Sequence, residues 1–224
     1  MTIDGVQRLE PLDEGAFRTY ALELAAGDPA LGAVVDTYGL PEFWRRPATF
    51  ATLVLLVVEQ QVSLASAKAV FDRMMVALGA VTPETLLSVA PDDLGRVGLT
   101  RQKQRYMRLL AEAVAEGSLD LAALALLPDS DARSRLLALT GIGPWTADCY
   151  LLAALGRPDM WPVGDRALQV GVGEVLGHPT VPTPQEVETL GDRWRPLRAV
   201  AARLVWHAYL TRRGRTEPVI VGLT

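Results

Sequence analysis

Apolar residues recur at helical spacing along most of this chain, and that periodicity constrains the fold more than any other feature. In the clearest stretches, apolar side chains follow one another three or four positions apart, as on one face of a helix. Two such sets are Tyr106, Leu109, Leu110, Ala113 and Val114, and Leu197, Val200, Ala201, Leu204 and Ala208. Strand-like alternation is scarce, although Val219-Ile220-Val221 fits a short strand near the end. The pattern predicts an all-α fold.

Glycine and proline divide the periodic stretches into separate helices. Typical breaks are Gly27-Asp28-Pro29 and Gly156-Arg157-Pro158. We expect helices over residues 12–26, 48–59, 63–78, 101–116, 131–139, 144–155, 165–176, 184–192 and 196–212. The chain has 224 residues, half of them hydrophobic, which suits one domain or two small interleaved ones with a sizeable core.

Composition excludes several classes of protein. No run of 18 or more apolar residues occurs, so no membrane span is expected. The single cysteine, Cys149, excludes an intrachain disulfide and a four-cysteine zinc or iron–sulfur site. The N-terminus lacks the basic start and apolar core of a secretory signal, which favours a reducing cytoplasm. The net charge of −4 argues against nucleic acid, although basic residues cluster at 45–46, 101–108 and 212–215. Each cluster alone is also compatible with a solvated helix face.

The most specific motif is LLALTGIGPWTA, at residues 136–147. Gly141 and Gly143 allow a tight turn around Ile142, and Pro144 is suited to the first position of the next helix. The backbone N–H groups at that helix N-terminus can bind an anion such as a DNA phosphate. Backbone amides and a helix dipole therefore weaken the objection raised by the acidic charge. A bare GIG sequence also fits an ordinary corner between two helices.

The longer pattern LTGIGPWTA resembles the hairpin of the helix-hairpin-helix DNA glycosylase superfamily, and within it the 3-methyladenine DNA glycosylase II branch. Further similarity lies in residues 59–68, 161–168 and 196–206, so the resemblance covers roughly residues 45 to 212. It implies a two-lobed helical fold, without the additional N-terminal sheet domain of some relatives. One lobe is expected over residues 48–160, with the helix-hairpin-helix at 131–155. The other is expected to combine residues 1–47 and 161–224, with DNA between the lobes.

The resemblance identifies Asp165 as the catalytic residue. It follows Pro162-Val163-Gly164 and opens a predicted helix, where the helix dipole and free N–H groups favour a carboxylate. Removing a base from deoxyribose develops positive charge on the sugar, as glycoside hydrolysis does, and an ionised carboxylate stabilises that charge. Aspartate is also a common N-cap, which is the simpler interpretation of its position.

The base pocket implied by the resemblance lies between Trp145 and Trp206. Trp206 lies off the apolar stripe of its own helix, which fits either a ligand pocket or a second packing surface. A tyrosine of the family corresponds here to Cys149, with Tyr150 adjacent, so the pocket departs from the family pattern. Relatives that also cut the strand carry a lysine where Trp145 stands.

The resemblance also implies DNA contacts and a cation. Gln61 is the expected wedge that fills the gap left by a flipped base, although the segment also fits a polar turn. The other expected contacts are Gln60, Val62, Ser63, Gly141, Ile142, Gly143 and Thr146. A Na⁺ or K⁺ ion is expected on the backbone carbonyls of Leu137, Leu139 and Gly141. His178 and His207 show no metal-ligand spacing, and we interpret both as structural.

These inferences together predict a monofunctional DNA glycosylase. It is expected to flip alkylated bases, such as 3-methyladenine or 7-methylguanine, out of double-stranded DNA and to hydrolyse their N-glycosidic bond. We expect a monomer in the cytoplasm, at the nucleoid, with no membrane partner, no required cofactor and no iron–sulfur cluster. Two alternatives stay open: a non-enzymatic helix-hairpin-helix DNA-binding module, and a helical protein-interaction domain, which the acidic charge slightly favours.

Overall fold

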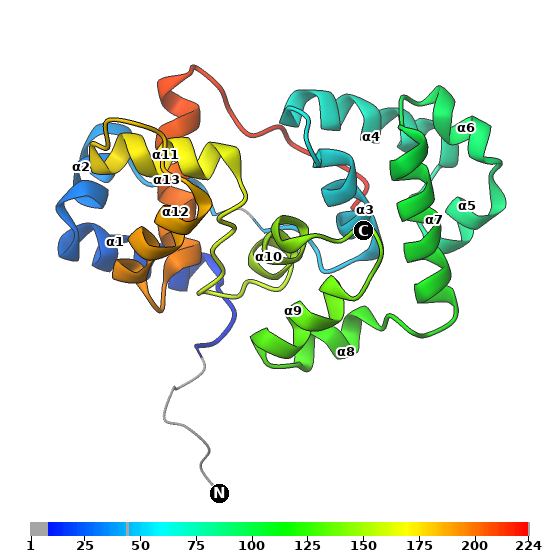
Figure 1. Ribbon diagram of the computed structural model, residues 1–224, viewed down its shortest axis with the longest axis horizontal. Helices are drawn as coiled ribbons and strands as arrows, with labels where there is room; N and C mark the ends of the chain where they lie inside the picture. Colours follow the sequence, from blue (N-terminus) through cyan, green and yellow to red (C-terminus); the bar gives the residue numbers. More distant parts are fainter. Residues whose placement is uncertain (1–8, 44, 224) are drawn as a thin grey trace, which may run out of the picture. The chain divides into compact units, whose positions relative to one another are not determined.

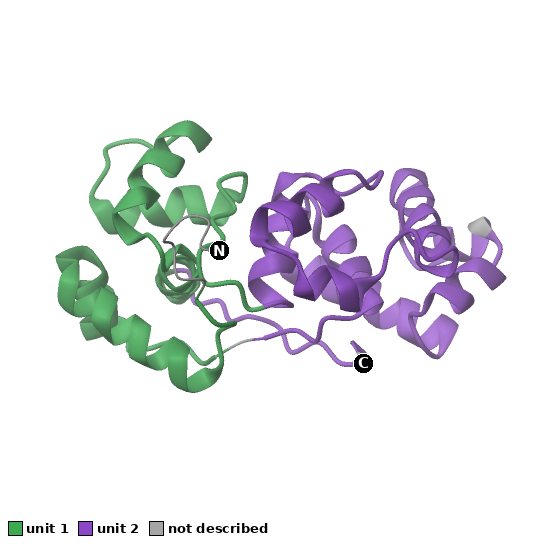
Figure 2. Cartoon of the chain, turned by 90° about the horizontal axis from the view of Figure 1, so that it is seen from below, with its two compact units in different colours: residues 1–44, 156–212 green, residues 45–155, 213–224 purple. Residues whose placement is uncertain are grey.

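The computed structural model describes residues 9–43 and 45–223. Within these ranges the secondary structure is helical and contains no strand (Figure 1), which confirms the all-α prediction. The chain forms two compact units (Figure 2). Unit 1 comprises residues 1–44 and 156–212, and unit 2 comprises residues 45–155 and 213–224. The backbone therefore passes from one unit to the other three times.

The C-terminal tail corrects the expected domain organisation. Residues 213–224 belong to unit 2, whereas the sequence placed them with the helices that precede them. The hydroxyl of Thr49 donates to the carbonyl of Leu223, and Gly222 packs against the side chain of Met75. The expected strand at Val219-Ile220-Val221 does not form. The boundaries of unit 2 lie at 45 and 155, a few residues before the expected 48 and 160.

Unit 1 is built around one central helix, α13, which contacts α1, α2 and α11. Gly171 of α11 is buried against α13, because a Cβ there would approach a side-chain carbon of Val205 to 2.6 Å. The missing side chain lets the two helices pack closely. The bounds of the unit's helices are α1 (Glu14–Gly27), α2 (Pro29–Tyr38), α11 (Arg166–Leu176), α12 (Pro184–Gly191), the short 3-10 helix η1 (Asp192–Trp194) and α13 (Arg198–Arg212).

Unit 2 surrounds the wholly buried helix α3, which contacts α4, α7 and α10. Beside its C-terminal end, Arg46 forms a buried ion pair with Glu59 through N···O distances of 2.6 and 2.8 Å. The backbone N–H of Arg46 also donates to the carbonyl of Ala153. The helices of the unit are α3 (Phe50–Glu59), α4 (Leu64–Leu78), α5 (Pro83–Ser88), α6 (Pro91–Arg96), α7 (Arg101–Ala115), α8 (Leu121–Leu126), α9 (Asp129–Leu137) and α10 (Pro144–Ala153).

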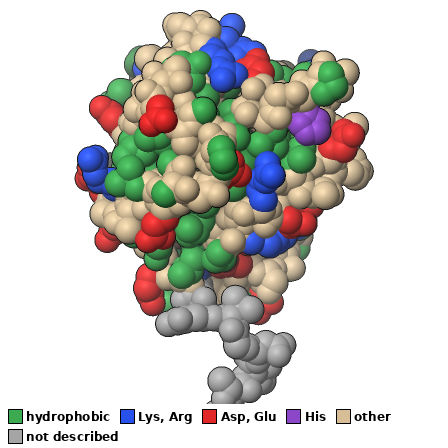
Figure 3. Space-filling view, turned by 90° about the vertical axis from the view of Figure 1, so that its left-hand side faces the viewer, with side chains coloured by type: hydrophobic (Ala, Val, Ile, Leu, Met, Phe, Trp, Pro, Cys, Tyr) green, Lys and Arg blue, Asp and Glu red, His purple; other side chains and the backbone are tan. Residues whose placement is uncertain are grey.

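Every helix that the sequence predicted is present, with its ends shifted by at most two residues. The helices α2, α5, α6 and α8 were not predicted. On the face of unit 1 seen in Figure 3, basic and acidic side chains are interspersed, and no broad basic patch gathers. None of the helices in the described ranges combines the length and apolar character needed to cross a bilayer.

Candidate active site and hairpin

Asp165 is the N-cap of α11. Its carboxylate oxygen Oδ1 accepts a hydrogen bond from the backbone N–H of Leu168 at 2.7 Å. Two further bonds fix the preceding loop: Asp165 donates its own N–H to the carbonyl of Pro162 at 2.8 Å, and the side-chain amide of Gln169 donates to the carbonyl of Val163 at 2.8 Å. The carboxylate is half-buried and is held at the surface of unit 1 by the helix that it caps.

Trp206 of α13 lies next to this carboxylate. Its indole Nε1–H donates to Oδ1 of Asp165 at 3.1 Å, so two N–H donors converge on one oxygen atom. The close packing of α11 and α13 at Gly171 brings the two residues together. This contact explains why Trp206 lies off the apolar stripe of its own helix, because the polar edge of its ring faces a carboxylate on the neighbouring helix.

The segment that leads to Asp165 is anchored by Trp161. This tryptophan is buried, and its Nε1–H donates to the carbonyl of Val187 at 2.9 Å. Its ring lies edge-on to Trp194, with 5.5 Å between centroids. A Cβ at Gly191 would lie 2.4 Å from the Trp161 ring, so the ring needs a glycine beside it. The sequence motif that contains Asp165 therefore begins in the core of unit 1.

The hairpin connects α9 and α10 in unit 2. Gly143 is the exposed N-cap of α10, and no side chain caps this helix. Gly141 has φ +94°, and a Cβ there would lie 2.4 Å from the ring of Tyr106, so only glycine fits. The side chain of Ile142 is buried and anchors the turn. The arrangement leaves backbone N–H groups at an exposed helix N-terminus, which is the geometry that binds an anion.

The loop between α3 and α4, residues 60–63, is bonded to the hairpin. The side-chain amide of Gln60 donates to the carbonyl of Gly141 at 2.9 Å and to the hydroxyl of Thr146 at 3.0 Å. Thr146 is only 2% exposed. Its hydroxyl faces Gln60 inside the protein, so the DNA contact expected of Thr146 would have to use its backbone and stays a prediction. Gln61 is exposed and has φ +58°. Val62 is exposed too, and exposed Ser63 caps α4.

The remaining residues of the expected base pocket lie on α10. Trp145 is half-buried, and Cys149 is buried. Tyr150 is 0% exposed, so its ring fills the core instead of lining an open pocket. Burial raises the pKa of its phenol, and no hydrogen-bond partner reaches the hydroxyl from the described residues. Trp145 belongs to unit 2 and Trp206 to unit 1, so a pocket between them stays a prediction.

Both lysines of the chain have partners. The ammonium group of Lys68 lies 2.6 Å from a carboxylate oxygen of Asp72. Lys103, which the sequence placed in a basic cluster, donates to the carbonyls of Val58 and Gln60 at 2.7 and 2.8 Å. Sequence reasoning missed this contact, because it depends on how α7 packs against α3.

Two of the three carbonyls expected to hold an alkali cation accept hydrogen bonds. The carbonyl of Gly141 accepts from the Gln60 amide, and that of Leu139 accepts from the N–H of Ile142 at 3.1 Å. A cation would have to use the second lone pair of each oxygen, and its presence stays a prediction. Within the described residues, no three His, Cys, Asp or Glu side chains are grouped so that they hold a metal. His207 Nε2 lies 3.1 Å from the carbonyl of Tyr38, which fits a structural role.

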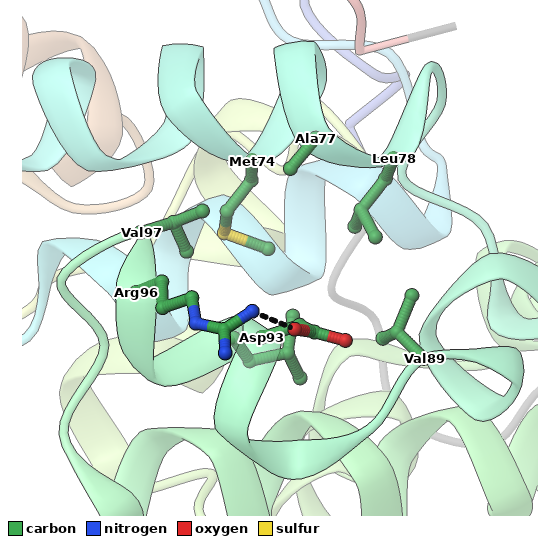
Figure 4. A pocket seen from close by; sticks show the side chains of 8 residues that line it. Met74, Ala77, Leu78, Val89, Asp93, Arg96 and Val97 are labelled. Carbon is green, nitrogen blue, oxygen red and sulfur yellow. Dashed lines mark hydrogen bonds and ion pairs between the residues drawn. The ribbon is translucent and has the colours of Figure 1, made fainter.

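A cavity of about 320 Å³ lies elsewhere in unit 2 (Figure 4). The ion pair between Arg96 and Asp93, at 2.8 Å, lies at its edge. The cavity shares no residue with the hairpin or with the 60–63 loop, and it is therefore separate from both. It is lined by Met74, Ala77, Leu78, Val89, Asp93, Leu94, Arg96 and Val97.

Comparisons with known proteins agree with this geometry. A family model described as HhH-GPD superfamily base excision DNA repair protein matches residues 54–196. A probable bifunctional transcriptional activator and DNA repair enzyme AlkA of Mycobacterium tuberculosis is 30% identical over 87% of this chain and 40% of its own length. A putative DNA-3-methyladenine glycosylase, YfjP of Bacillus subtilis, is 25% identical over 72% of this chain and 59% of its own.

A solved structure has the same fold. The crystal structure of a DNA-3-methyladenine glycosidase from Bacillus halodurans superposes with a TM-score of 0.72 and 29% sequence identity. The match covers 88% of this chain and 92% of that one. The chain thus spans nearly all of this relative, but only 40% and 59% of the two curated proteins above.

Proposed function

Because the chain belongs to the HhH-GPD superfamily of base excision DNA repair proteins, we propose that it is a DNA glycosylase that removes alkylated bases from double-stranded DNA. It hydrolyses the N-glycosidic bond and leaves the sugar–phosphate strand intact. Its substrates are purines that alkylation has made cationic, of the 3-methyladenine and 7-methylguanine types. The observation that carries the proposal is the hydrogen-bonded pair of Asp165 and Trp206.

Asp165 supplies the charge that the reaction needs. Departure of the base leaves an oxocarbenium-like sugar, as in glycoside hydrolysis, and a carboxylate beside that carbon stabilises the positive charge. The N–H groups of Leu168 and Trp206 hold Oδ1 of Asp165 in one orientation. Because the carboxylate is positioned in advance, it requires little reorganisation as the charge develops. A water molecule then completes the hydrolysis at the sugar carbon.

The aromatic groups favour cationic bases. A base inside a duplex is out of reach, so the nucleotide has to be flipped out at a cost of a few kcal/mol. An alkylated purine is attracted to an indole face by ~0.5–2 kcal/mol once it is desolvated, which is comparable to the flipping cost. Trp206 offers such a ring directly beside the carboxylate. The positive charge also makes the base a better leaving group, so Asp165 has less of the barrier to lower.

The absence of strand cleavage follows from the chain's amines. A lyase forms a Schiff base through an amine nucleophile, and Trp145 occupies the hairpin position at which bifunctional relatives carry a lysine. Lys68 is ion-paired with Asp72, and Lys103 is bonded to two backbone carbonyls. Neither lysine is presented by the hairpin, which supports a monofunctional enzyme.

Backbone groups and one side chain account for DNA binding by an acidic protein. The exposed N-terminus of α10 at Gly143 can hold a phosphate through its N–H groups and helix dipole. Exposed Gln61, between α3 and α4, enters the space left by the flipped nucleotide. The binding is directed by the geometry of these groups more than by a broad positive field, in keeping with the net charge of −4.

A base-release assay tests the proposal. The protein is incubated with matched duplexes that contain 3-methyladenine, 7-methylguanine, hypoxanthine or 8-oxoguanine, and the products are analysed with and without hot alkali. We expect release of the two cationic bases and strand breaks only after alkali, with no adduct trapped by borohydride. If 8-oxoguanine is the best substrate, the assigned substrate class is wrong. DNA binding without release of any base would identify a non-enzymatic module, and no DNA binding at all would identify a protein-interaction domain.

A further inference from the structure

Lys103 of α7 caps the C-terminal end of α3. Its ammonium group donates to the carbonyl of Val58 at 2.7 Å and to that of Gln60 at 2.8 Å. The last carbonyls of a helix lack partners within the helix, and a positive charge there complements the helix dipole. Burial lowers the pKa of Lys103, as expected for a group partly withdrawn from water. Within the described part of the chain, its exposed neighbours Arg101 and Arg105 make no comparable contact with α3.

The residue that follows this cap has a strained backbone. Gln61 is the one non-glycine residue in the described ranges with a positive φ, at +58°, a conformation that L-residues rarely adopt. The carbonyl of Gln60 belongs to the peptide that leads directly into Gln61. The hydrogen bond from Lys103 to this carbonyl therefore restrains the peptide group between Gln60 and Gln61, and with it the φ angle of Gln61.

The same face of α7 also contacts the hairpin. Tyr106 lies three positions after Lys103, on the same side of the helix, and its ring packs against Gly141. The side chain of Gln60 completes the connection through its hydrogen bonds to Gly141 and Thr146. The side chains of Lys103, Tyr106 and Gln60 thus hold the 60–63 loop and the hairpin in fixed positions relative to each other within unit 2.

We propose that Lys103 is a positioning residue for DNA binding. It holds Gln61 in the positive-φ conformation from which this side chain enters the duplex, and it keeps the 60–63 loop in place beside the phosphate-binding hairpin. The inference rests on the proposed function, because it assigns Gln61 the role of the wedge. Lys103 acts through Gln61 and touches neither the damaged base nor the reacting atoms. It also differs from a phosphate-binding lysine, which would strengthen binding to any DNA.

The test uses the full chain and four variants: Lys103→Met, Gln61→Ala, the double variant and, as matched control, Arg105→Met. Single-turnover excision of 7-methylguanine is measured over a range of enzyme concentrations, with affinities for an abasic-site duplex and for undamaged duplex at several salt concentrations. We expect Lys103→Met to slow excision by about tenfold, as for the loss of a charged hydrogen bond, and to weaken abasic-site binding similarly. Its affinity for undamaged DNA and its salt dependence should match the wild type. Arg105→Met removes a charge from an exposed position of the same helix and should leave excision and abasic-site binding at the wild-type level.

The double variant decides whether Lys103 acts through Gln61. If it does, Lys103→Met adds nothing in the Gln61→Ala background, because the side chain that it positions is already gone. Additive losses overturn the proposal. The proposal is also overturned if Lys103→Met weakens binding to undamaged DNA and lowers the slope of log affinity against log salt concentration by about one. That change is the signature of a phosphate contact. If Lys103→Met does not fold, Lys103→Gln, which keeps one donor group, is subjected to the same comparisons. A wild type that binds abasic-site DNA but releases no base refutes the proposed function and leaves the binding test of Lys103 intact.

Discussion

Replacing Asp165 by asparagine separates the charge of this side chain from its structural role. In the structure, Oδ1 accepts hydrogen bonds from Leu168 N–H at 2.7 Å and from Trp206 Nε1–H at 3.1 Å. The amide oxygen of asparagine can accept both, and asparagine is as good an N-cap as aspartate. The variant therefore keeps the geometry of α11 and of the indole and loses only the negative charge.

The expected magnitudes differ for rate and stability. Loss of a group that stabilises transition-state charge costs ~10²–10³ in rate, so excision by Asp165→Asn should be at least ~100-fold slower, equivalent to about 2.7 kcal/mol. The free energy of unfolding should change by less than about 0.5 kcal/mol, because both caps are equivalent. Asp165→Ala is the structural control. It loses the cap, worth ~0.5–2 kcal/mol, and each kcal/mol lowers the melting temperature of a chain of this size by about 2–4 °C.

The assay is single-turnover release of 7-methylguanine with enzyme in excess, accompanied by thermal unfolding and by affinity for an abasic-site duplex. Asp165→Asn should melt like the wild type, bind abasic DNA like the wild type and release almost no base. Excision by Asp165→Asn within threefold of the wild-type rate would refute the catalytic assignment and leave Asp165 as a helix cap alone. A large drop in its melting temperature would show instead that the charge itself is needed for folding.

Three further outcomes are expected. Trp206→Phe keeps an aromatic ring and loses the N–H donor, so it should slow excision by about tenfold without weakening abasic-site binding, and an unchanged rate would contradict the positioning role of the indole. Gly141→Ala should lower the free energy of unfolding by more than about 1 kcal/mol, because φ is +94° and Tyr106 occupies the space of a Cβ; Gly143→Ala, with nothing within 4 Å, is the control and should unfold like the wild type. Hydrogen bonds from the N–H and hydroxyl of Thr183, the N-cap of α12, lower the pKa of Glu186 below its ordinary 4.5. The contribution of Glu186 to stability is therefore complete above that value and is lost as the pH falls through the lowered pKa. Urea unfolding across that pH range should show a smaller loss in Glu186→Gln than in the wild type, because Glu84, whose pKa hydrogen bonds also lower, titrates in both proteins.

The sequence predicted the helices that carry strong periodicity or a clear cap, and it missed the short ones. The six-residue helices α5, α6 and α8 span fewer than two turns, which is too short for a 3.6-residue period to stand out. The ten-residue helix α2 was missed because Gly27-Asp28-Pro29 was interpreted only as a break. In the structure, Asp28 caps α2, and Pro29 occupies its first turn.

The candidate site was predictable in its residue types and not in its contacts. The N-cap position of Asp165 follows from the local sequence, because capping is a property of a few neighbouring residues. The bond from Trp206 depends on the close approach of two helices at Gly171, which no local pattern encodes. The interior position of Thr146 and the cap provided by Lys103 depend likewise on partners 86 and 45 residues away in the chain.

The tail that returns to unit 2 has a consequence for the order of folding during synthesis. The contact between Thr49 and Leu223 joins residues 174 positions apart, and all of residues 156–212, most of unit 1, is translated between the two parts of unit 2. Loop closure over such a distance is slow relative to local helix formation. Residues 45–155 of unit 2 are therefore made before most of unit 1, yet the contact between Thr49 and Leu223 can form only after all of residues 156–212 has been translated.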